Sequence, residues 1–293
     1  MELKKALSYD QQIERLIKDH NLKIEDKDRA IKILKTVNYY RLSGYGIGLK
    51  SKLNKEHYIK DISLNHLFKL YCFDSQFKNN LIRTIEQIEI QLRTQIAYHI
   101  AMKYGPGGLM NESNFIHKTN KNNVSIYSII SNNLEKEIYR QKKSPFVKHH
   151  IKKYNSKFPI WVSVELMSFG TLSSLFSILQ NEDQKEISNL YNTDSNHLKN
   201  WILCLVEVRN ICAHYTRLYN MPLKQTPNLY KENEKYKGNI NKIFPILLIL
   251  KRMLNSNEQW ESLLKDIKKT FEKYDGYFKL SFMNFPDNWY DIL

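Results

Sequence analysis

The spacing of hydrophobic residues along the chain favours helix over strand. The strongest pattern lies in residues 63–104, where apolar side chains recur every three or four positions and therefore align on one helix face. The sequence Gly-Pro-Gly-Gly at 105–108 ends this pattern. We predict a long buried helix here, and the residues of its apolar stripe are Phe77, Leu81, Ile85, Ile88, Leu92, Ile96 and Ile100.

Capping residues and helix breakers divide the rest of the chain into shorter predicted helices. Ser8 and Gln11 form a capping-box pattern before a helix that reaches about residue 20, and Asp26 can cap a second helix that ends near Gly44. Further helices are predicted at 124–142, 145–154, 171–180, 182–191, 196–219, 239–254 and 257–274, with 160–167 helical or mixed. No internal repeat or clear linker is present. We therefore predict one all-α unit with an N-terminal helical subdomain at 1–62 and a helical core at 63–293.

Composition supports this fold class and adds a functional constraint. Glycine and proline together make only 16 of 293 residues, whereas loop-rich β folds need more of both. A chain of this length can bury a core without disulfide or metal staples. The 45 Lys and Arg residues against 30 Asp and Glu residues give a net charge of +15. Such an excess attracts polyanions, either nucleic acid or an anionic membrane surface.

Three observations predict a cytoplasmic protein with no membrane segment. The longest apolar run, at 243–250, holds eight residues, whereas a membrane-spanning helix needs about 20. Residues 1–5 lead into an amphipathic segment, so we expect no signal peptide. The three cysteines are an odd number and lie among apolar neighbours, which is typical of reduced thiols.

Motifs for several enzyme classes are missing from the chain. The sequence contains no P-loop, dinucleotide fingerprint, HExxH, paired CxxC or GxSxG motif, so an NTPase, nucleotidyltransferase or zinc hydrolase has no local support. Cys212 and His214, two residues apart on a predicted helix, point to nearly opposite faces. We expect no metal site and no cofactor.

A polar stripe marks the otherwise apolar helix predicted at 196–219. Glu207, Asn210, His214 and Arg217 are spaced three, four and three residues apart, which places them on one face. Arg209 lies five residues before His214, so its long side chain must bend to reach the same pocket. An imidazole beside cations suits cleavage of RNA by its own 2′-hydroxyl. The imidazole moves a proton, and the guanidinium neutralises charge on the phosphoryl oxygens.

The Arg-x(4–6)-His spacing by itself is weak evidence, because about 0.8 matches are expected by chance and three occur. Arg15 and His20 lie near the end of a surface helix, where a cation interacts favourably with the helix dipole. Arg93 and His99 follow Glu89, which favours a structural ion pair over a second catalytic site. For the third pair, within the polar stripe, spacing alone favours neither a structural nor a catalytic role.

Longer strings in the chain resemble a known family. The string VRNICAHYTRLYN at 208–220 resembles the signature of abortive-infection proteins of the AbiD/AbiF-like group, in the HEPN superfamily of helical ribonucleases. Other similar strings follow the family's order along the chain, so the resemblance covers about residues 10–220. They are VNYYRLSGY at 37–45, LYCFDSQFKNNLIRTIEQIEIQLRTQIAYHI at 70–100, KYGP at 103–106 and PIWVSVELMSFGTLSSLF at 159–176.

The resemblance implies a multi-helix HEPN-like bundle, commonly a homodimer that brings two Arg-x4-His motifs into one cleft. It also implies metal-independent RNA cleavage as a phage-triggered growth arrest, in some relatives restrained by a small non-coding RNA antitoxin. Arg209 and His214 match the defining pair, and Asn210 matches the polar residue after the arginine. Arg217 and Asn220 match the rest of the group's string. The chain departs from the family after SGY, where residue 46 is glycine instead of a bulky residue.

Further candidates for RNA contact carry weaker signals. Tyr40 and Arg41 are candidates to stack on and clamp RNA, although aromatic residues at a helix end more often pack. Lys148 and Lys152 belong to a dense basic tract, which is either a solvated face or a phosphate contact. Glu207, Arg93 and His99 complete the set of candidate RNA-binding residues.

Together these signals predict a metal-independent endoribonuclease that acts as an abortive-infection or toxin effector on single-stranded or looped RNA. His214 is the predicted general acid/base, Arg209 the transition-state residue, Asn210 an orienting group and Arg217 a second phosphate ligand. The alternative is a non-catalytic RNA-binding module that holds a structured small RNA. A membrane-surface protein is a third interpretation, but the basic residues are scattered over many predicted helices.

Overall fold

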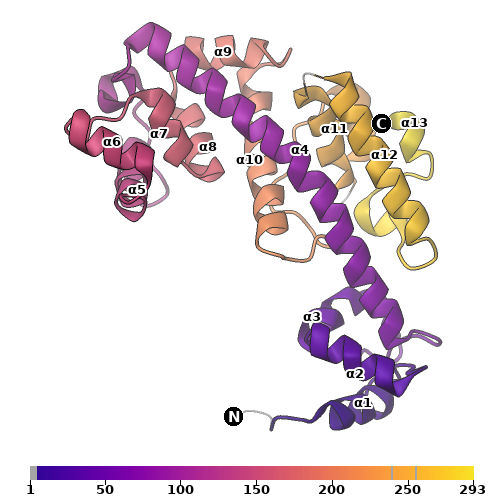
Figure 1. Ribbon diagram of the computed structural model, residues 1–293. Coiled ribbons are helices and arrows are strands. Elements are labelled where there is room, and N and C mark those ends of the chain that lie inside the picture. The colour runs from indigo at the N-terminus through magenta and orange to yellow at the C-terminus, as the bar shows by residue number, and fades with distance from the viewer. Residues whose placement is uncertain (1–4, 239, 255) are drawn as a thin grey trace.

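The computed structural model describes residues 5–238, 240–254 and 256–293. In these ranges the fold is a multi-helix bundle, and its β-structure is limited to isolated bridges, which confirms the all-α prediction. Figure 1 shows the helices in order. They are α1 (Tyr9–Lys18), α2 (Lys27–Thr36), α3 (Tyr39–Ser43), α4 (Leu64–Tyr104), α5 (Ile126–Arg140), α6 (Pro145–Lys153), α7 (Ile160–Leu166), α8 (Phe169–Ile178), α9 (Asn181–Asn189), α10 (Ser195–Ala213), α11 (Phe244–Met253), α12 (Asn257–Lys273) and α13 (Trp289–Ile292).

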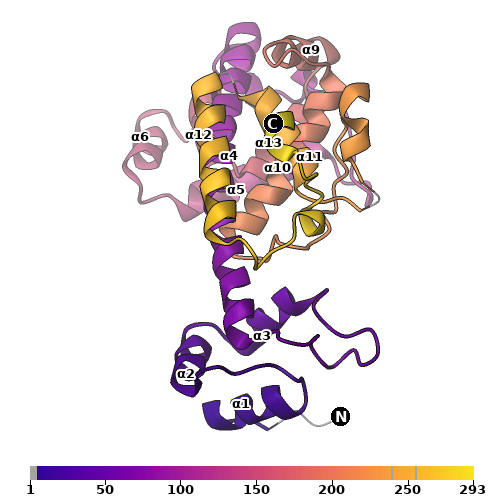
Figure 2. The ribbon, with the colours of Figure 1, turned by 90° about the vertical axis from the view of Figure 1, so that its right-hand side faces the viewer.

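The long helix α4 organises the molecule. Ser63 caps its first turn by accepting a hydrogen bond from the backbone N–H of His66, and Gly105, with a φ of 78°, ends it. The predicted apolar stripe is completely buried from Phe77 to Ile100. In Figures 1 and 2, α1–α3 surround the first part of α4, α10–α12 run along its middle, and α5–α9 gather at its far end.

The N-terminal helices follow their capping signals closely. Ser8 and Gln11 form the predicted capping box of α1, and Asp26 caps α2. The second predicted helix is divided, because Val37 is extended and Asn38 caps the separate helix α3. The buried residues of these helices belong to the same hydrophobic cluster as those of α4. The core is therefore continuous across the predicted subdomain boundary at residue 62.

Two predicted helix boundaries differ in the second half of the chain. α10 ends at Ala213 rather than near residue 219. α11 begins at Phe244, where the sequence predicted a helix from 239; residue 239 itself lies outside the described residues. Residues 1–4, on which the expectation of no signal peptide partly rests, lie outside them too. Among the helices that the structure describes, none is long and apolar enough to cross a bilayer.

Candidate active site

A left-handed turn ends α10 directly after His214. Tyr215 has a φ of 56°, and the backbone N–H of Thr216 donates to the carbonyl of Ile211 at 3.0 Å. This is the hydrogen-bond pattern of a Schellman motif, which usually carries glycine at the left-handed position. Because the helix ends here, Arg217 lies beyond it. The prediction that Arg217 shares a helix face with His214 is wrong.

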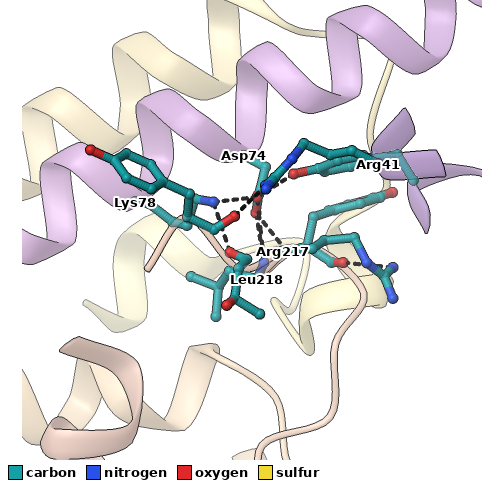
Figure 3. Close-up of polar contacts among 9 residues, drawn as sticks. Arg41, Asp74, Lys78, Arg217 and Leu218 are labelled. Atoms are coloured by element: carbon teal, nitrogen blue, oxygen red, sulfur yellow. Dashed lines mark hydrogen bonds and ion pairs between the residues drawn. The ribbon is translucent and has the colours of Figure 1, made fainter. Parts of the chain in front are cut away.

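A buried carboxylate on α4 binds the backbone that follows this turn (Figure 3). Asp74 is completely buried and accepts hydrogen bonds from the backbone N–H groups of Leu218, at 3.1 Å, and Tyr219, at 2.7 Å. Lys78, one helical turn further along α4, forms a 3.0 Å ion pair with Asp74. The hydroxyl of Tyr45 donates to Asp74 at 2.7 Å. A buried charge with this many partners fixes the path of the loop.

Two cations bind carbonyls of the turn itself. The ammonium of Lys78 donates to the carbonyl of Thr216 at 2.8 Å, and the guanidinium of Arg41 donates to the carbonyl of Tyr215 at 2.6 Å. Carbonyls near a helix C-terminus lack intrahelical partners, and cations there are favourable. Side chains from α3 and α4 thus hold the end of α10, which fixes the backbone that carries His214.

The imidazole of His214 is exposed, and none of the other described side chains binds it. Its backbone N–H donates to the carbonyl of Asn210 at 3.0 Å, so the main chain is fixed at the end of α10. Within the ranges that the structure describes, no side chain forms a hydrogen bond or ion pair with the ring. Both ring nitrogens are therefore available to a bound molecule, as a general acid or base requires.

Arg209 is oriented by a buried carboxylate. Its Nε lies 3.5 Å from Oε2 of Glu89 on α4, and a terminal guanidinium nitrogen lies 3.4 Å from Oδ1 of Asn210. Glu89 is buried and also pairs with Arg93, so one carboxylate compensates two guanidinium groups. One edge of the Arg209 guanidinium is thereby anchored. Its side chain is still 32% exposed, which leaves donors for an anionic ligand.

Arg209 and Asn210 thus lie on the last two turns of α10 and His214 is its C-cap residue, with Asn210 and His214 exposed. The described part of the structure shows no direct contact between Arg209 and His214. This agrees with their offset of about 140° around the helix.

Arg217 and Asn220 connect the loop after α10 to the N-terminal subdomain. Arg217 is half-buried, donates to the carbonyl of Tyr219 at 3.1 Å and packs against Gly44. Burial lowers the pKa of Arg217. The side-chain amide of Asn220 donates to the carbonyl of Ile47 at 2.9 Å. These predicted phosphate ligands make structural contacts in this chain.

Other predicted candidates lie apart from the end of α10 or are occupied by structural contacts. Both carboxylate oxygens of Glu207 accept hydrogen bonds, at 2.8 Å, from the backbone N–H groups of Lys224 and Gln225. Tyr40, on the same short helix as Arg41, is 88% exposed and free to stack. The basic tract with Lys148 and Lys152 is exposed on α6, at the opposite end of the molecule from α3 in Figures 1 and 2.

Arg93 and His99 hold other helices against α4. Arg93 is buried and donates to the carbonyl of Val164 on α7 and to Glu89, so the ion pair favoured by the sequence is present. Nε2 of His99 lies 2.9 Å from Oδ1 of the buried Asp183 on α9. The structure does not bring this pair to the end of α10.

Asp183 is the centre of that second cluster. Lys103, Tyr104 and His99 all contact its carboxylate. Burial alone would raise the pKa of Asp183, but these hydrogen bonds outweigh burial and hold it below its usual value. The carboxylate is therefore a fully paired structural charge.

Sequence reasoning missed several residues that support the site. Asp74 and Lys78 are charged residues four apart within the most apolar helix, and this contrast was a usable signal for a buried ion pair. The sequence indicates Arg93 as a partner of Glu89 but not Arg209. Lys242, which donates to Oδ1 of Asn220 at 3.1 Å, carries no local sequence signal.

The site has no companion metal cluster in the described ranges, where no group of three or more His, Cys, Asp or Glu side chains is placed to hold an ion.

Comparison with known families places this site in context. The model of the family described as Abi-like protein matches residues 32–220, which is more than half of the chain. The chain belongs to the Abi-like protein family. The match includes Asp74 and Glu89 as well as Arg209 and His214, and family membership supports a role in abortive infection and phage defence. No curated protein and no solved structure matches the chain.

Proposed function

We propose that this Abi-like protein is a HEPN-type endoribonuclease of the AbiD/AbiF-like group and acts as a toxin-like effector in the cytoplasm. One observation carries the proposal: an exposed, unpaired imidazole at the fixed end of α10 lies on the same two helical turns as a guanidinium anchored by a buried carboxylate. His214 is the general acid/base, Arg209 binds the scissile phosphate, and Asn210 orients it.

The proposed reaction is transesterification within the RNA. The 2′-oxygen attacks phosphorus and loses its proton to a base, while the bond from phosphorus to the 5′-oxygen breaks and that oxygen gains a proton. The products end in a 2′,3′-cyclic phosphate and a 5′-hydroxyl. Imidazole exchanges protons near neutral pH, and a guanidinium stabilises the charge that develops on the phosphoryl oxygens. The chemistry requires no metal or cofactor.

We further propose that the active form is a homodimer. In-line attack places the 2′-oxygen and the leaving 5′-oxygen on opposite sides of phosphorus, so the two proton transfers occur at separate positions. Each chain supplies one exposed imidazole at the end of α10. A second copy of the chain provides the second imidazole. A small RNA antitoxin that occupied this shared site would restrain the enzyme.

The proposed substrate is single-stranded or looped RNA, because in-line attack requires a nucleotide that can leave A-form geometry. The net charge of +15 favours any polyanion, so affinity alone does not test the chemistry.

Cleavage of total cellular RNA in EDTA, with product ends mapped, tests the proposal. We expect wild-type protein to cut and leave 2′,3′-cyclic phosphates, and His214→Ala to be inactive. His117→Ala is the matched control, because it removes another exposed imidazole that lies outside α10. Metal-free products that end in 3′-hydroxyl groups would contradict the mechanism.

If neither wild type nor His214→Ala cuts while both bind RNA equally, the nuclease proposal fails. The protein is then a non-catalytic module that holds a structured small RNA, and sequencing of copurified RNA identifies it.

A further inference from the structure

A pocket of about 580 Å³ lies where α6 and the start of α7 meet the loop after α4. Its walls come from three segments: the loop after α4, the C-terminal part of α6 and the first residues of α7. The side chains that matter for its chemistry are Met110, His150, Tyr154, Lys157 and Trp161. This volume is in the range of pockets that bind small ligands.

Stacked aromatic rings form one wall of the pocket. The His150 ring stacks on Phe158, with centroids 5.4 Å apart, and on Tyr154, with centroids 5.3 Å apart. Nδ1 of His150 lies 2.8 Å from the carbonyl of Phe146, and because a carbonyl can only accept, this nitrogen is the donor. The hydrogen bond fixes the ring plane. A flat ligand therefore meets a rigid aromatic surface.

Trp161 contributes another flat surface that the fold leaves uncovered. It is 51% exposed, whereas the other three tryptophans, Trp201, Trp260 and Trp289, are 1%, 7% and 8% exposed. Tyr154 is 47% exposed. Large aromatic side chains are mostly buried when they serve the core. Two half-exposed aromatic side chains that line the same pocket therefore indicate a surface for stacking.

The α6 side of the pocket is strongly basic. Residues 142–161 contain six lysines and no aspartate or glutamate. Lys148, Lys152 and Lys153 are exposed on α6, and Lys157 lines the pocket. A flat apolar hollow beside a row of cations is complementary to a ligand that joins a planar ring to regularly spaced negative charges. Single-stranded nucleic acid has this chemistry.

We propose that this pocket, which we call the base pocket, binds a nucleobase of single-stranded RNA while the lysines of α6 contact the flanking phosphates. This inference rests on the proposed RNA substrate and adds a second contact region to it. α6 lies at the left of the molecule in Figures 1 and 2, apart from α10 near the centre. An RNA that reaches both regions is therefore held at two places, which favours longer single strands over short ones.

Binding to catalytically disabled protein tests the base pocket without any cleavage. Full-length His214→Ala is titrated with a labelled single-stranded oligoadenylate and with an abasic oligonucleotide of the same length and charge. Base stacking on an aromatic side chain predicts about tenfold tighter binding of the oligoadenylate. Because Trp161 is the exposed tryptophan, the oligoadenylate also quenches the protein's fluorescence, whereas the abasic strand does not.

Paired tyrosine variants separate stacking from local charge. Tyr154→Ala removes a wall of the pocket, and Tyr139→Ala is the matched control. Both rings are exposed and carry a lysine over one face, Lys153 at 5.6 Å and Lys142 at 4.1 Å, but Tyr139 does not line the pocket. We expect Tyr154→Ala and Trp161→Ala to abolish the preference for oligoadenylate, and Tyr139→Ala to retain it. Thermal unfolding confirms that each variant is folded.

Replacement of two α6 lysines tests the phosphate contacts. Lys148→Ala with Lys152→Ala should weaken binding of both oligonucleotides by the same factor, since both carry the same phosphates. Unchanged affinity for both strands would overturn this part of the proposal.

The outcomes distinguish this inference from the proposed function. Equal affinity for both oligonucleotides without fluorescence quenching overturns the base pocket, even if wild-type protein cuts RNA. A preference for oligoadenylate that Trp161→Ala abolishes supports the base pocket, even if wild-type protein never cuts RNA and the nuclease proposal fails.

Discussion

Two Arg–His pairs in this chain share nearly the same spacing but have opposite environments. In the pair on α4, Arg93 is buried and forms an ion pair with Glu89. The His99 side chain is only 14% exposed and contacts Asp183. In the pair on α10, His214 is exposed and Arg209 retains a partly exposed guanidinium. Spacing alone does not separate a structural pair from a candidate catalytic one, whereas partners and exposure do.

The difference has a physical origin in where each histidine lies on its helix. His99 lies inside α4, and α9 packs against that part of the helix with a buried carboxylate that needs partners. His214 is the C-cap residue of α10, and the chain turns away directly after it. No further helical turn therefore covers the His214 side chain. A helix end whose backbone is fixed by side chains of other helices, and whose own side chain is exposed, is thus a suitable place for a reactive group.

Alanine substitutions of the two histidines give the largest expected contrast. We expect His214→Ala to lower the rate of RNA cleavage by about 10²- to 10⁴-fold, because it removes general acid/base catalysis. His99→Ala should leave the rate per folded molecule within about twofold and lower the unfolding midpoint, since it removes a partner of Asp183. Single-turnover cleavage and thermal unfolding measure both effects.

Equal loss of cleavage in both variants, with both folded, would contradict this assignment. It would mean that the α4 pair is a functional part of the active site.

Glu89 connects the two pairs, and its substitution gives the next largest effect. Glu89→Gln leaves Arg93 buried without its counter-charge and releases Arg209. Removal of one partner of a buried ion pair predicts a loss of about 3 kcal/mol in the free energy of unfolding. Cleavage per folded molecule should also fall, because the Arg209 guanidinium loses its anchor. Urea unfolding and cleavage assays measure the two losses.

Glu86→Gln is the matched control, because Glu86 is exposed one turn earlier on the same helix. If both variants unfold at the same urea concentration, the buried carboxylate does not stabilise the fold as we infer.

Local signals in the sequence were sufficient for much of the fold. The stripe from Phe77 to Ile100 predicted α4, and the capping box at Ser8 predicted the start of α1. Both features depend on residues within a few positions of each other. Helix periodicity and capping are local, so a single sequence reveals them.

The end of α10 depends on residues far away in the sequence and was therefore mispredicted. No glycine or proline marks the turn, and tyrosine occupies the left-handed position. Asp74 and Arg41 hold that turn from more than a hundred residues away. For the same reason the sequence indicated Arg209 and His214 but did not reveal the link between Glu89 and Arg209. The roles of Arg217 and Glu207 changed once their backbone partners were known.

The smallest expected effect is a loss of stability in acid at the contact between α4 and α9. It tests the structural role that we assign to His99 and its partner Asp183. Hydrogen bonds from Lys103, Tyr104 and His99 hold the pKa of Asp183 below its usual value of 3.8, despite burial. A carboxylate with a lowered folded-state pKa stabilises the fold above the unfolded-state pKa, and this stabilisation is lost as pH falls through the folded-state value. Asp183→Asn should therefore cost about 2 kcal/mol of unfolding free energy at pH 7. The difference from wild type should shrink below about pH 4. Urea unfolding of both proteins between pH 7 and pH 3 measures this difference, and a gap that stays constant over that range would show that Asp183 is not stabilised as a charged group.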